Sequence, residues 1–295
     1  MFEAFRLETV ELSEASIRVR HGGCGRPVLL IHGHPRTHVT WHRVAAILAS
    51  SHTVVCPDLP GFGRSSQPPD TPDHRHSSKR TKARIFVELM RRLGFETFAV
   101  VGHDRGAYTA FRMALDYPEL VTHLGVLDAV PISEALSRCD SRFAEAWWHW
   151  FFYAQPEKPE QAINRDPLSW YGGSPESMGA HVYQDFVAAI CNPSVVHGML
   201  EDYRAGLGID RNDEVADREA GRMVQCPTLA LWSLKDDLEK LYGDVLAVWR
   251  PWTKTLQGRG LTSGHHMAEE IPEELANELR NFLNVRENSD LKSTD

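Results

Sequence analysis

A five-residue stretch, Gly102-His103-Asp104-Arg105-Gly106, constrains this chain more than any other feature of its sequence. It follows the apolar run 98–101 and precedes a helix-like stretch at 108–115. The flanking glycines permit a sharp, strained turn from a strand into a helix, because they carry no side chain that would clash there. Such a turn exposes the side chain in its middle. The segment therefore predicts a strand–turn–helix unit that presents the carboxylate of Asp104.

The same frame is the nucleophile elbow of α/β-hydrolases, which most often carries serine in the middle. An aspartate is already ionised at neutral pH, but its attack on an ordinary ester or amide would give a high-energy mixed anhydride. Attack on a saturated carbon that carries halide, or on a strained epoxide, gives an ordinary ester on the enzyme. Water must then cleave that ester, which requires a general base and an oxyanion hole.

Length and composition indicate a globular chain of ordinary type. The 295 residues suit one large domain or a core with an inserted lid. A net charge of -8, without a block of Lys and Arg, argues against a nucleic-acid partner. The N-terminus lacks the pattern of a signal peptide, and no stretch is long enough for a membrane span. The five scattered cysteines are typical of reduced thiols, so we expect a cytoplasmic protein.

Strand-like and helix-like segments alternate along most of the chain, which predicts an α/β fold. We expect a mostly parallel sheet with helices on both faces and an inserted helical cap. Runs 6–12 and 16–20 alternate as half-exposed antiparallel edge strands do, and 226–231 resumes the strand pattern after an aromatic-rich stretch. The expected divisions are a first core part, a helical cap, a second core part and a disordered tail, at 1–130, 131–217, 218–288 and 289–295.

The order nucleophile, acid, histidine that is typical of these hydrolases points to the base and its partner. His265 directly follows Gly264 near the end of the chain and is the candidate base. Its orienting acid has two candidate positions: Asp128 ends the strand after the elbow helix, and Asp236 ends the later strand. Asp128 is favoured, and Asp236 stays open as the alternative acid.

The loop 32–35 follows the third strand and is expected to supply the second donor of the oxyanion hole. The backbone N–H of His34 is the candidate, beside that of Arg105. The fifteen histidines invite a metal interpretation through His32 and His34 or His74 and His76. Neither pair has a carboxylate and a third histidine at the spacing of a zinc site, so we expect no metal and no cofactor.

At this point the sequence resembles the haloacetate (fluoroacetate) dehalogenases of the α/β-hydrolase superfamily, over nearly the whole chain. Motifs shared with epoxide hydrolases also carry part of this resemblance: His32-Gly33-x-Pro35, the segment 57–66 and the elbow. The more specific ones lie in the expected cap: Trp148-His149-Trp150 and Asp202-Tyr203-Arg204-Ala205-Gly206.

The resemblance implies roles for individual residues. It implies Asp104 as nucleophile, Asp128 as acid and His265 as base. It implies that His149, Trp150 and Tyr203 donate hydrogen bonds to the leaving halide, and that Arg105 binds a substrate carboxylate. The family carries a second arginine three residues after the first, where this chain has Tyr108. One charge-assisted bond to the carboxylate is thereby lost, unless Arg36 from the facing loop replaces it.

Three functions are compatible with these residues. The first is a hydrolytic dehalogenase for a small halogenated substrate, with a 2-halocarboxylate as the expected class. The second is an epoxide hydrolase with the same Asp and His and with tyrosines that protonate the epoxide, Tyr203 with Tyr153 or Tyr183. The third is a ligand-binding protein on a hydrolase scaffold, which the complete set of nucleophile, acid and base disfavours. We expect no membrane partner, and a homodimer is left open.

Overall fold

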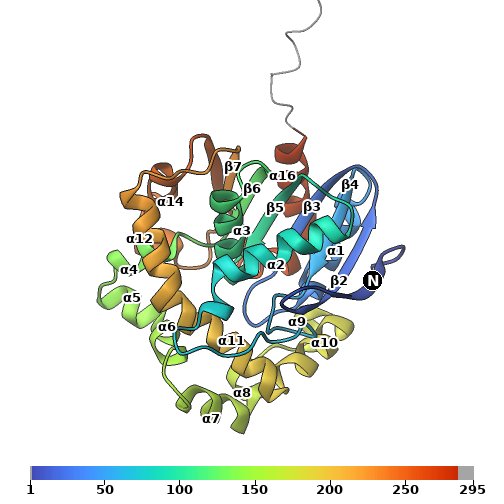
Figure 1. Cartoon of the computed structure of the whole chain (residues 1–295). Coiled ribbons are helices and arrows are strands. Elements are labelled where there is room, and N and C mark those ends of the chain that lie inside the picture. Colours follow the sequence, from blue (N-terminus) through green and yellow to red (C-terminus); the bar gives the residue numbers. More distant parts are fainter. Residues whose placement is uncertain (1, 285–295) are drawn as a thin grey trace, which may run out of the picture.

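A single eight-stranded sheet runs through the molecule in the order β1-β2-β4-β3-β5-β6-β7-β8 (Figure 1). The structure, a computed structural model, describes residues 2–284. β1 and β2 pair antiparallel at one edge, β2 pairs antiparallel with β4, and the strands from β4 to β8 are parallel. The predicted α/β class is therefore confirmed. The strands are Arg6–Glu11 (β1), Ser16–Gly23 (β2), Arg26–Ile31 (β3), His52–Pro57 (β4), Phe98–His103 (β5), Val121–Leu127 (β6), Thr228–Ser233 (β7) and Leu256–Leu261 (β8).

Helices cover both faces of this sheet. α2 (Lys79–Arg92) and α3 (Arg105–Asp116) pack together on one face, and α1 (His42–Leu48) and α16 (Pro272–Leu283) on the other (Figure 1). Each face has its own buried apolar cluster, because parallel strands bury both of their faces. The remaining helices of the core are η1 (His38–Trp41), η2 (Arg75–Ser77), α13 (Leu238–Tyr242), α14 (Val245–Trp249), η4 (Arg250–Trp252) and α15 (Met267–Glu270).

Between β6 and β7 the described chain forms helices and connecting loops. Many of these helices lie beyond one end of the sheet, at the bottom of Figure 1. The predicted boundaries at 131 and 217 stay predictions. The predicted tail at 289–295 and the end of the second core segment lie outside the described residues. The helices are α4 (Ile132–Ser137), α5 (Ser141–Ala146), α6 (Trp148–Tyr153), α7 (Lys158–Arg165), α8 (Pro167–Tyr171), α9 (Pro175–Met178), α10 (Ala180–Ile190), α11 (Pro193–Ala205), η3 (Gly206–Asp210) and α12 (Arg211–Glu219).

Several element boundaries differ from the sequence-based expectation; β1 ends at Glu11 rather than 12, and β2 runs to Gly23 rather than 20. β7 begins at Thr228 rather than 226, because Pro227 has no N–H to donate to a neighbouring strand. α3 begins at Arg105, directly after the elbow, rather than at 108. All five cysteines are free. Within residues 2–284, every helix is too short or too polar to cross a membrane.

The elbow is a tight junction between β5, α3 and the end of β3. Asp104 has φ 51° and ψ −119°, a conformation that L-residues rarely adopt. A side chain at Gly106 would lie 2.3 Å from the backbone oxygen of Ile31, and one at Gly102 would lie 2.2 Å from the backbone oxygen of Gly106. Both glycines are therefore required because backbone approaches backbone there, and this approach fixes where Asp104 points.

The close approach generates a stability prediction. Gly106→Ala should lower the free energy of unfolding by about 1–3 kcal/mol, the usual cost of overpacking, although alanine favours a helix. Gly208→Ala is the matched control, since a Cβ there meets no atom within 4 Å. Urea unfolding of both variants measures the difference. Equal stability of the two would contradict the account of the junction.

Candidate active site

The two oxygens of the Asp104 carboxylate face different groups. Oδ1 accepts a hydrogen bond of 2.7 Å from the backbone N–H of His34, in the loop after β3. Oδ2 lies 3.9 Å from Nε2 of His265, in the loop after β8. The neighbouring Gly33 lets this loop come close, because a Cβ there would lie 2.5 Å from Asp104. One oxygen is thus bound by the predicted oxyanion donor, while the other is left toward the predicted base.

The surroundings of Asp104 favour its ionised form. Burial acts to raise the pKa of its carboxyl group, but His265, His103 and Arg105 lower it by more, together with the backbone N–H of Arg105. The pKa of Asp104 is therefore below its ordinary value. The carboxylate is charged at neutral pH, as a nucleophile must be.

His265 is bound by both candidate acids. Its Nδ1 lies 2.7 Å from an oxygen of Asp128 and 3.1 Å from one of Asp236. Asp128 is fixed further by the backbone N–H of Ser233, which donates to its other oxygen at 2.9 Å. Burial opposes the imidazolium, but the hydrogen bonds and charges of the carboxylates raise the pKa of His265 well above its ordinary value. The structure brings both acids to the base rather than selecting one of them.

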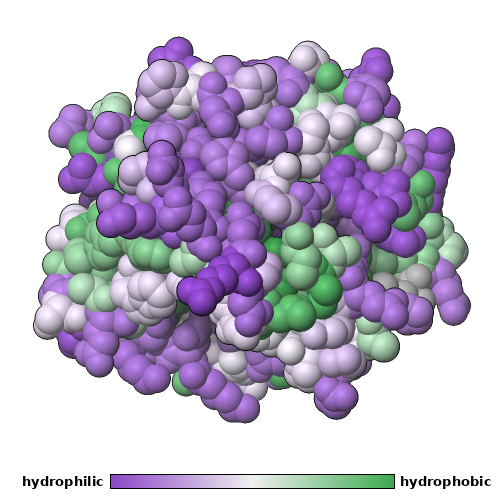
Figure 2. Space-filling model, turned by 90° about the horizontal axis from the view of Figure 1, so that it is seen from below, coloured by the Kyte–Doolittle hydropathy of each residue, from purple (hydrophilic) through white to green (hydrophobic). Residues whose placement is uncertain are grey.

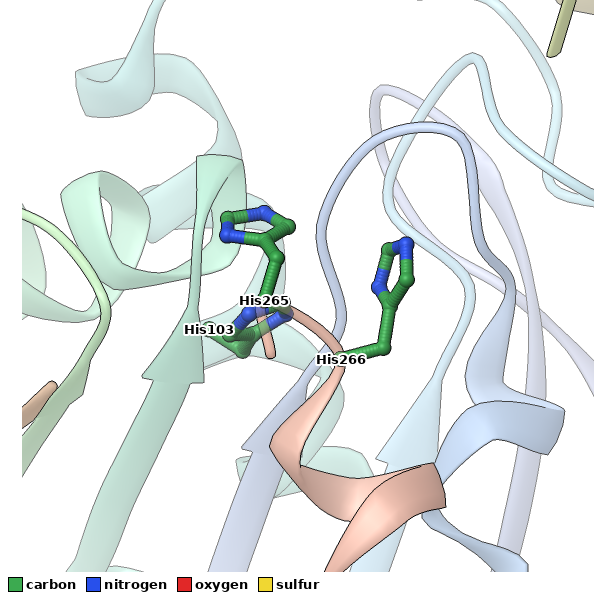
Figure 3. Close-up of side chains that lie close together, drawn as sticks. All are labelled: His103, His265 and His266. Atoms are coloured by element: carbon green, nitrogen blue, oxygen red, sulfur yellow. The ribbon is translucent and has the colours of Figure 1, made fainter. Parts of the chain in front are cut away.

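Three histidines meet at this point, His103 at the end of β5 and His265 with His266 in the loop after β8 (Figure 3). The ring of His265 lies 4.7 Å from that of His103 and 5.2 Å from that of His266. Burial lowers the pKa of His103 to about 3 and holds that of His266 well below its ordinary value. His265 is therefore the protonatable member of the three at neutral pH.

Three groups of side chains within residues 2–284 have donor atoms close enough to share a cation. Two of them contain His265 and belong to the site just described. In the third, His197 already pairs with Asp70 at 2.9 Å, and His74 pairs with Glu201 at 2.8 Å. These pairs are satisfied without an ion. The members of the groups are His103, His265 and His266; Asp128, Asp236 and His265; and Asp70, His197 and Glu201.

A cavity of about 570 Å³ lies next to His265 and Asp128, between the core and helices α5, α6, α8 and α11. Three predicted substrate-binding residues, His34, His149 and Tyr203, line it. The ring of His34 packs against those of Tyr203, Tyr153 and Tyr171, at 5.2 to 5.4 Å. Viewed from below, the molecule has hydrophobic areas among hydrophilic ones (Figure 2). The remaining lining residues are Pro35, Arg36, Asp128, Ala146, Trp147, Trp170, Gly173, Asp236, Asp237, Leu238, His265 and His266.

His149 and Tyr203 enter this cavity as neutral hydrogen-bond donors. Burial is the main cause that lowers the pKa of His149 to about 4, so its imidazole is uncharged at neutral pH. Burial likewise raises the pKa of Tyr203 well above its ordinary value, so its hydroxyl keeps its proton. A neutral ring N–H and a phenol O–H can both donate to an anion that develops between them.

Trp150 and Tyr108 lie behind the cavity wall and are not among its lining residues. The indole of Trp150 stacks on that of Trp147 at 5.1 Å, and the ring of Tyr108 meets Trp150 edge-on at 6.1 Å. Both side chains are almost fully buried. In this structure they pack around the site, and their direct contact with substrate stays a prediction.

Arg105 is held mainly by an internal partner. Its Nε and Nη2 donate to the carboxylate and the backbone oxygen of Asp202, on α11. Its guanidinium also lies over the ring of Tyr203, at 4.1 Å. Of the three guanidinium nitrogens of Arg105, only Nη1 is buried without a hydrogen-bond partner among the described residues. Two of the three guanidinium nitrogens are thus already engaged by Asp202, which limits what Arg105 can offer to a substrate carboxylate.

The other arginine considered for this role, Arg36, is also engaged. It lines the cavity, but its Nε and Nη2 donate to the carboxylate of Glu269 at 2.9 and 3.2 Å. Its guanidinium lies over the ring of Phe186 at 4.9 Å. Arg36 therefore does not supply the missing second arginine in this structure.

Sequence reasoning missed the aromatic residues that form much of the wall. Trp147 donates its indole N–H to Asp237 at 2.8 Å, and Trp170 donates to the hydroxyl of Tyr153 at 2.9 Å. Trp170 and Tyr171 belong to α8, a short helix that begins at Pro167 and is followed by two glycines. The density of aromatic residues was visible in the sequence, but which rings face the cavity depends on how these short helices pack.

Comparison with known proteins identifies the family of this chain. Residues 26–267 match the family model described as alpha/beta hydrolase fold. The chain belongs to the α/β-hydrolase family. It is 39% identical to a fluoroacetate dehalogenase of Burkholderia sp, over 96% of this chain and 95% of that protein. It therefore lies in the haloacetate dehalogenase-like part of the family, as the sequence motifs predicted.

Two further relatives extend the comparison. A solved α/β-hydrolase structure from Nostoc sp PCC 7120 has a TM-score of 0.92 and 40% identity, covering 97% of this chain and 100% of that one. A soluble epoxide hydrolase of Corynebacterium sp. (strain C12) is 29% identical over 85% of this chain and 87% of its own length. A protein named as a dehalogenase and one named as an epoxide hydrolase are thus both among the relatives.

The charge pairing under the site can be tested by stability. Asp202 is fully buried and contacts Arg105, Lys79 and Lys82. Asp202→Asn should lower the free energy of unfolding by about 3–5 kcal/mol, because it leaves buried cations without their counter-charge. Asp213→Asn is the matched control, since its pair with Arg80 is partly exposed and such pairs contribute little. Urea unfolding should separate the two variants; similar midpoints would contradict this assignment.

Proposed function

We propose that the protein is a hydrolytic dehalogenase in which Asp104 displaces halide from a small halogenated carboxylate. The observation that carries the proposal is the arrangement of Asp104, with one oxygen on the His34 N–H and the other facing His265. The name of the Burkholderia relative, fluoroacetate dehalogenase, supports the same reaction.

In the first step Oδ2 of Asp104 attacks the carbon that bears the halogen. A C–O bond forms as the carbon–halogen bond breaks, and the halide leaves with the bonding electron pair. The product is an ester in which Oδ1 has become the carbonyl oxygen, still on the His34 N–H. His149 and Tyr203 would donate to the halide as its charge develops, and an enclosed site strengthens such bonds.

In the second step a water between His265 and the ester attacks the carbonyl carbon. Nε2 of His265 takes one proton from this water, and the N–H groups of His34 and Arg105 stabilise the oxyanion on Oδ1. The tetrahedral intermediate collapses, the alkoxide takes the proton from His265, and Asp104 returns as a carboxyl group that ionises. The overall reaction consumes one water and releases an alcohol, a halide ion and a proton.

The size and the walls of the cavity favour a substrate larger than a haloacetate. A volume of about 570 Å³ falls within the range of pockets that hold drug-sized ligands. Trp147, Trp170 and Tyr171 form an aromatic wall, and Asp236 and Asp237 disfavour a second negative charge. An apolar substituent beside the halogen fits these features.

The covalent ester provides the first test. His265→Asn should release about one halide per enzyme molecule and then stop, because the ester forms without a base but is not hydrolysed. Intact mass spectrometry after incubation with chloroacetate should detect the adduct, and peptide mapping should locate it on Asp104. Asp104→Asn should release no halide, and His181→Gln, at an exposed histidine of α10, should behave as the parent enzyme. Steady turnover without an adduct in His265→Asn would reject the mechanism.

The aromatic wall provides the second test. With 2-chloro-3-phenylpropanoate, Trp170→Ala should raise KM roughly tenfold, since it removes an aromatic contact and its buried area. KM for chloroacetate should change little. Leu168→Ala is the control, because Leu168 lies on the same helix α8, is 43% exposed and is outside the cavity lining. Chloride release measures both. An equal change for the two substrates would contradict an aromatic contact at the substituent.

An epoxide hydrolase is the second candidate. It is favoured by the tyrosines that contact His34 in the loop 32–35, since Tyr153 and Tyr203 both line the cavity with their rings 5.0 Å apart. Either hydroxyl could protonate an epoxide oxygen while Asp104 attacks the ring carbon. The soluble epoxide hydrolase of Corynebacterium among the relatives supports this reading. Turnover of styrene oxide, without halide release from any halogenated acid, would establish it over the dehalogenase.

A further inference from the structure

The base is held by two carboxylates from different strands, and they differ in burial. Asp128 follows β6, its side chain is 1% exposed, and the Ser233 N–H fixes it. Asp236 follows β7, and its side chain is 31% exposed. Both contact the same atom of His265, Nδ1, which carries one proton to donate. One carboxylate would be enough to orient the ring, so the second requires another explanation.

We propose that Asp236 is a second acid that sets the pH range of the hydrolytic step, while Asp128 orients the ring of His265. The inference rests on the proposed function. Asp236 is partly solvated and therefore keeps its negative charge at low cost. Placed 3.1 Å from Nδ1, that charge stabilises the imidazolium that forms when His265 takes the proton of water. Asp236 is thus a positioning residue that acts through His265.

The charge of Asp104 determines at which stage of the reaction the charge of Asp236 controls the protonation of His265. In the free enzyme His265 faces three carboxylates, Asp104, Asp128 and Asp236, which together favour its protonated form. When Asp104 becomes an ester it loses its charge, so only two negative charges, those of Asp128 and Asp236, remain beside His265. His265 can then release its proton to solvent and act as a base. Because both remaining carboxylates raise the pKa of His265, the neutral imidazole is a strong base. The same raised pKa means that His265 loses its proton only at higher pH.

Among the charged and titratable groups that surround His265, Asp236 is the one whose charge we expect to set the pKa of His265. His103 and His266 have pKa values below the ordinary value for histidine and stay uncharged, as does His149. Arg36 is paired with Glu269. The carboxylate of Asp237 accepts a hydrogen bond from the indole N–H of Trp147, while Nδ1 of His265 contacts Asp128 and Asp236. The titratable and charged groups that face His265 are His103, Asp104, Arg36, Asp128, His149, Asp236, Asp237 and His266.

The test is the pH dependence of Asp236→Asn. The decay of the ester enzyme, followed by quenched-flow mass spectrometry after a single turnover of chloroacetate, should have its acid limb about one pH unit lower than in the parent. Above the limb the rate should be roughly threefold lower, less than the tenfold change in basicity, because the proton is only partly transferred to His265 in the transition state. The two profiles should therefore cross, with the variant faster in acid. At saturating chloroacetate the amplitude of the first-turnover burst of chloride should be unchanged, since formation of the ester needs no base.

Controls separate this role from a structural one. Asp236→Glu should restore the parental limb, and Asp244→Asn, an exposed helix cap after β7, should leave it in place. NMR titration of ¹⁵N-labelled histidine should give a lower pKa for His265 in Asp236→Asn, whether or not the enzyme turns over. A rate lowered equally at every pH, or an unchanged His265 pKa, would overturn the inference. A missing chloride burst in the parent enzyme would instead reject the proposed function and leave the NMR result to judge Asp236.

Discussion

The site depends on how one ionised carboxylate, that of Asp104, is held at the end of β5. The backbone at this residue has a positive φ, which is uncommon for residues other than glycine. The conformation persists because Gly102, Gly106 and the end of β3 are packed backbone against backbone. The same packing brings the His34 N–H to one oxygen of Asp104 and leaves the other toward His265. Fold stability and reactivity are therefore determined by the same contacts.

Charge balance links this carboxylate to the helices between β6 and β7. Arg105, next to the nucleophile, is bound by Asp202 of α11, and Asp202 also contacts Lys79 and Lys82 of α2. These groups are all buried, so each charge requires its partner. The arrangement connects the elbow, α2 and α11 through ion pairs. It also limits what Arg105 can offer a substrate, because Nη1 is its only nitrogen that is buried and unpaired within the described residues.

Motifs with a local physical cause could be predicted from the sequence. The elbow is defined by glycines that only a tight turn requires, and the alternation of strands and helices gave the α/β class. The candidates Asp104, Asp128 and His265 lie together in the structure, and His34, His149 and Tyr203 line one cavity. Their roles in catalysis stay predictions.

What could not be predicted depends on packing between distant segments. Asp128 and Asp236 were alternatives in the sequence, because each ends a strand at the same edge of the sheet. Both reach Nδ1 of His265, since β6 and β7 are adjacent in that sheet. Likewise, no local pattern indicates that Asp202 pairs with Arg105, 97 residues earlier in the chain. Long-range partners of this kind are set by tertiary structure.

The central claim is that the oxygen of the product comes from Asp104 and not directly from water. A single turnover with enzyme in excess, run in H₂¹⁸O, tests it most directly. The account predicts that the hydroxyl of the first product carries ¹⁶O, and that the peptide containing Asp104 gains ¹⁸O. A first product labelled with ¹⁸O, with an unlabelled Asp104, would contradict the account, because water would then have displaced the halide itself.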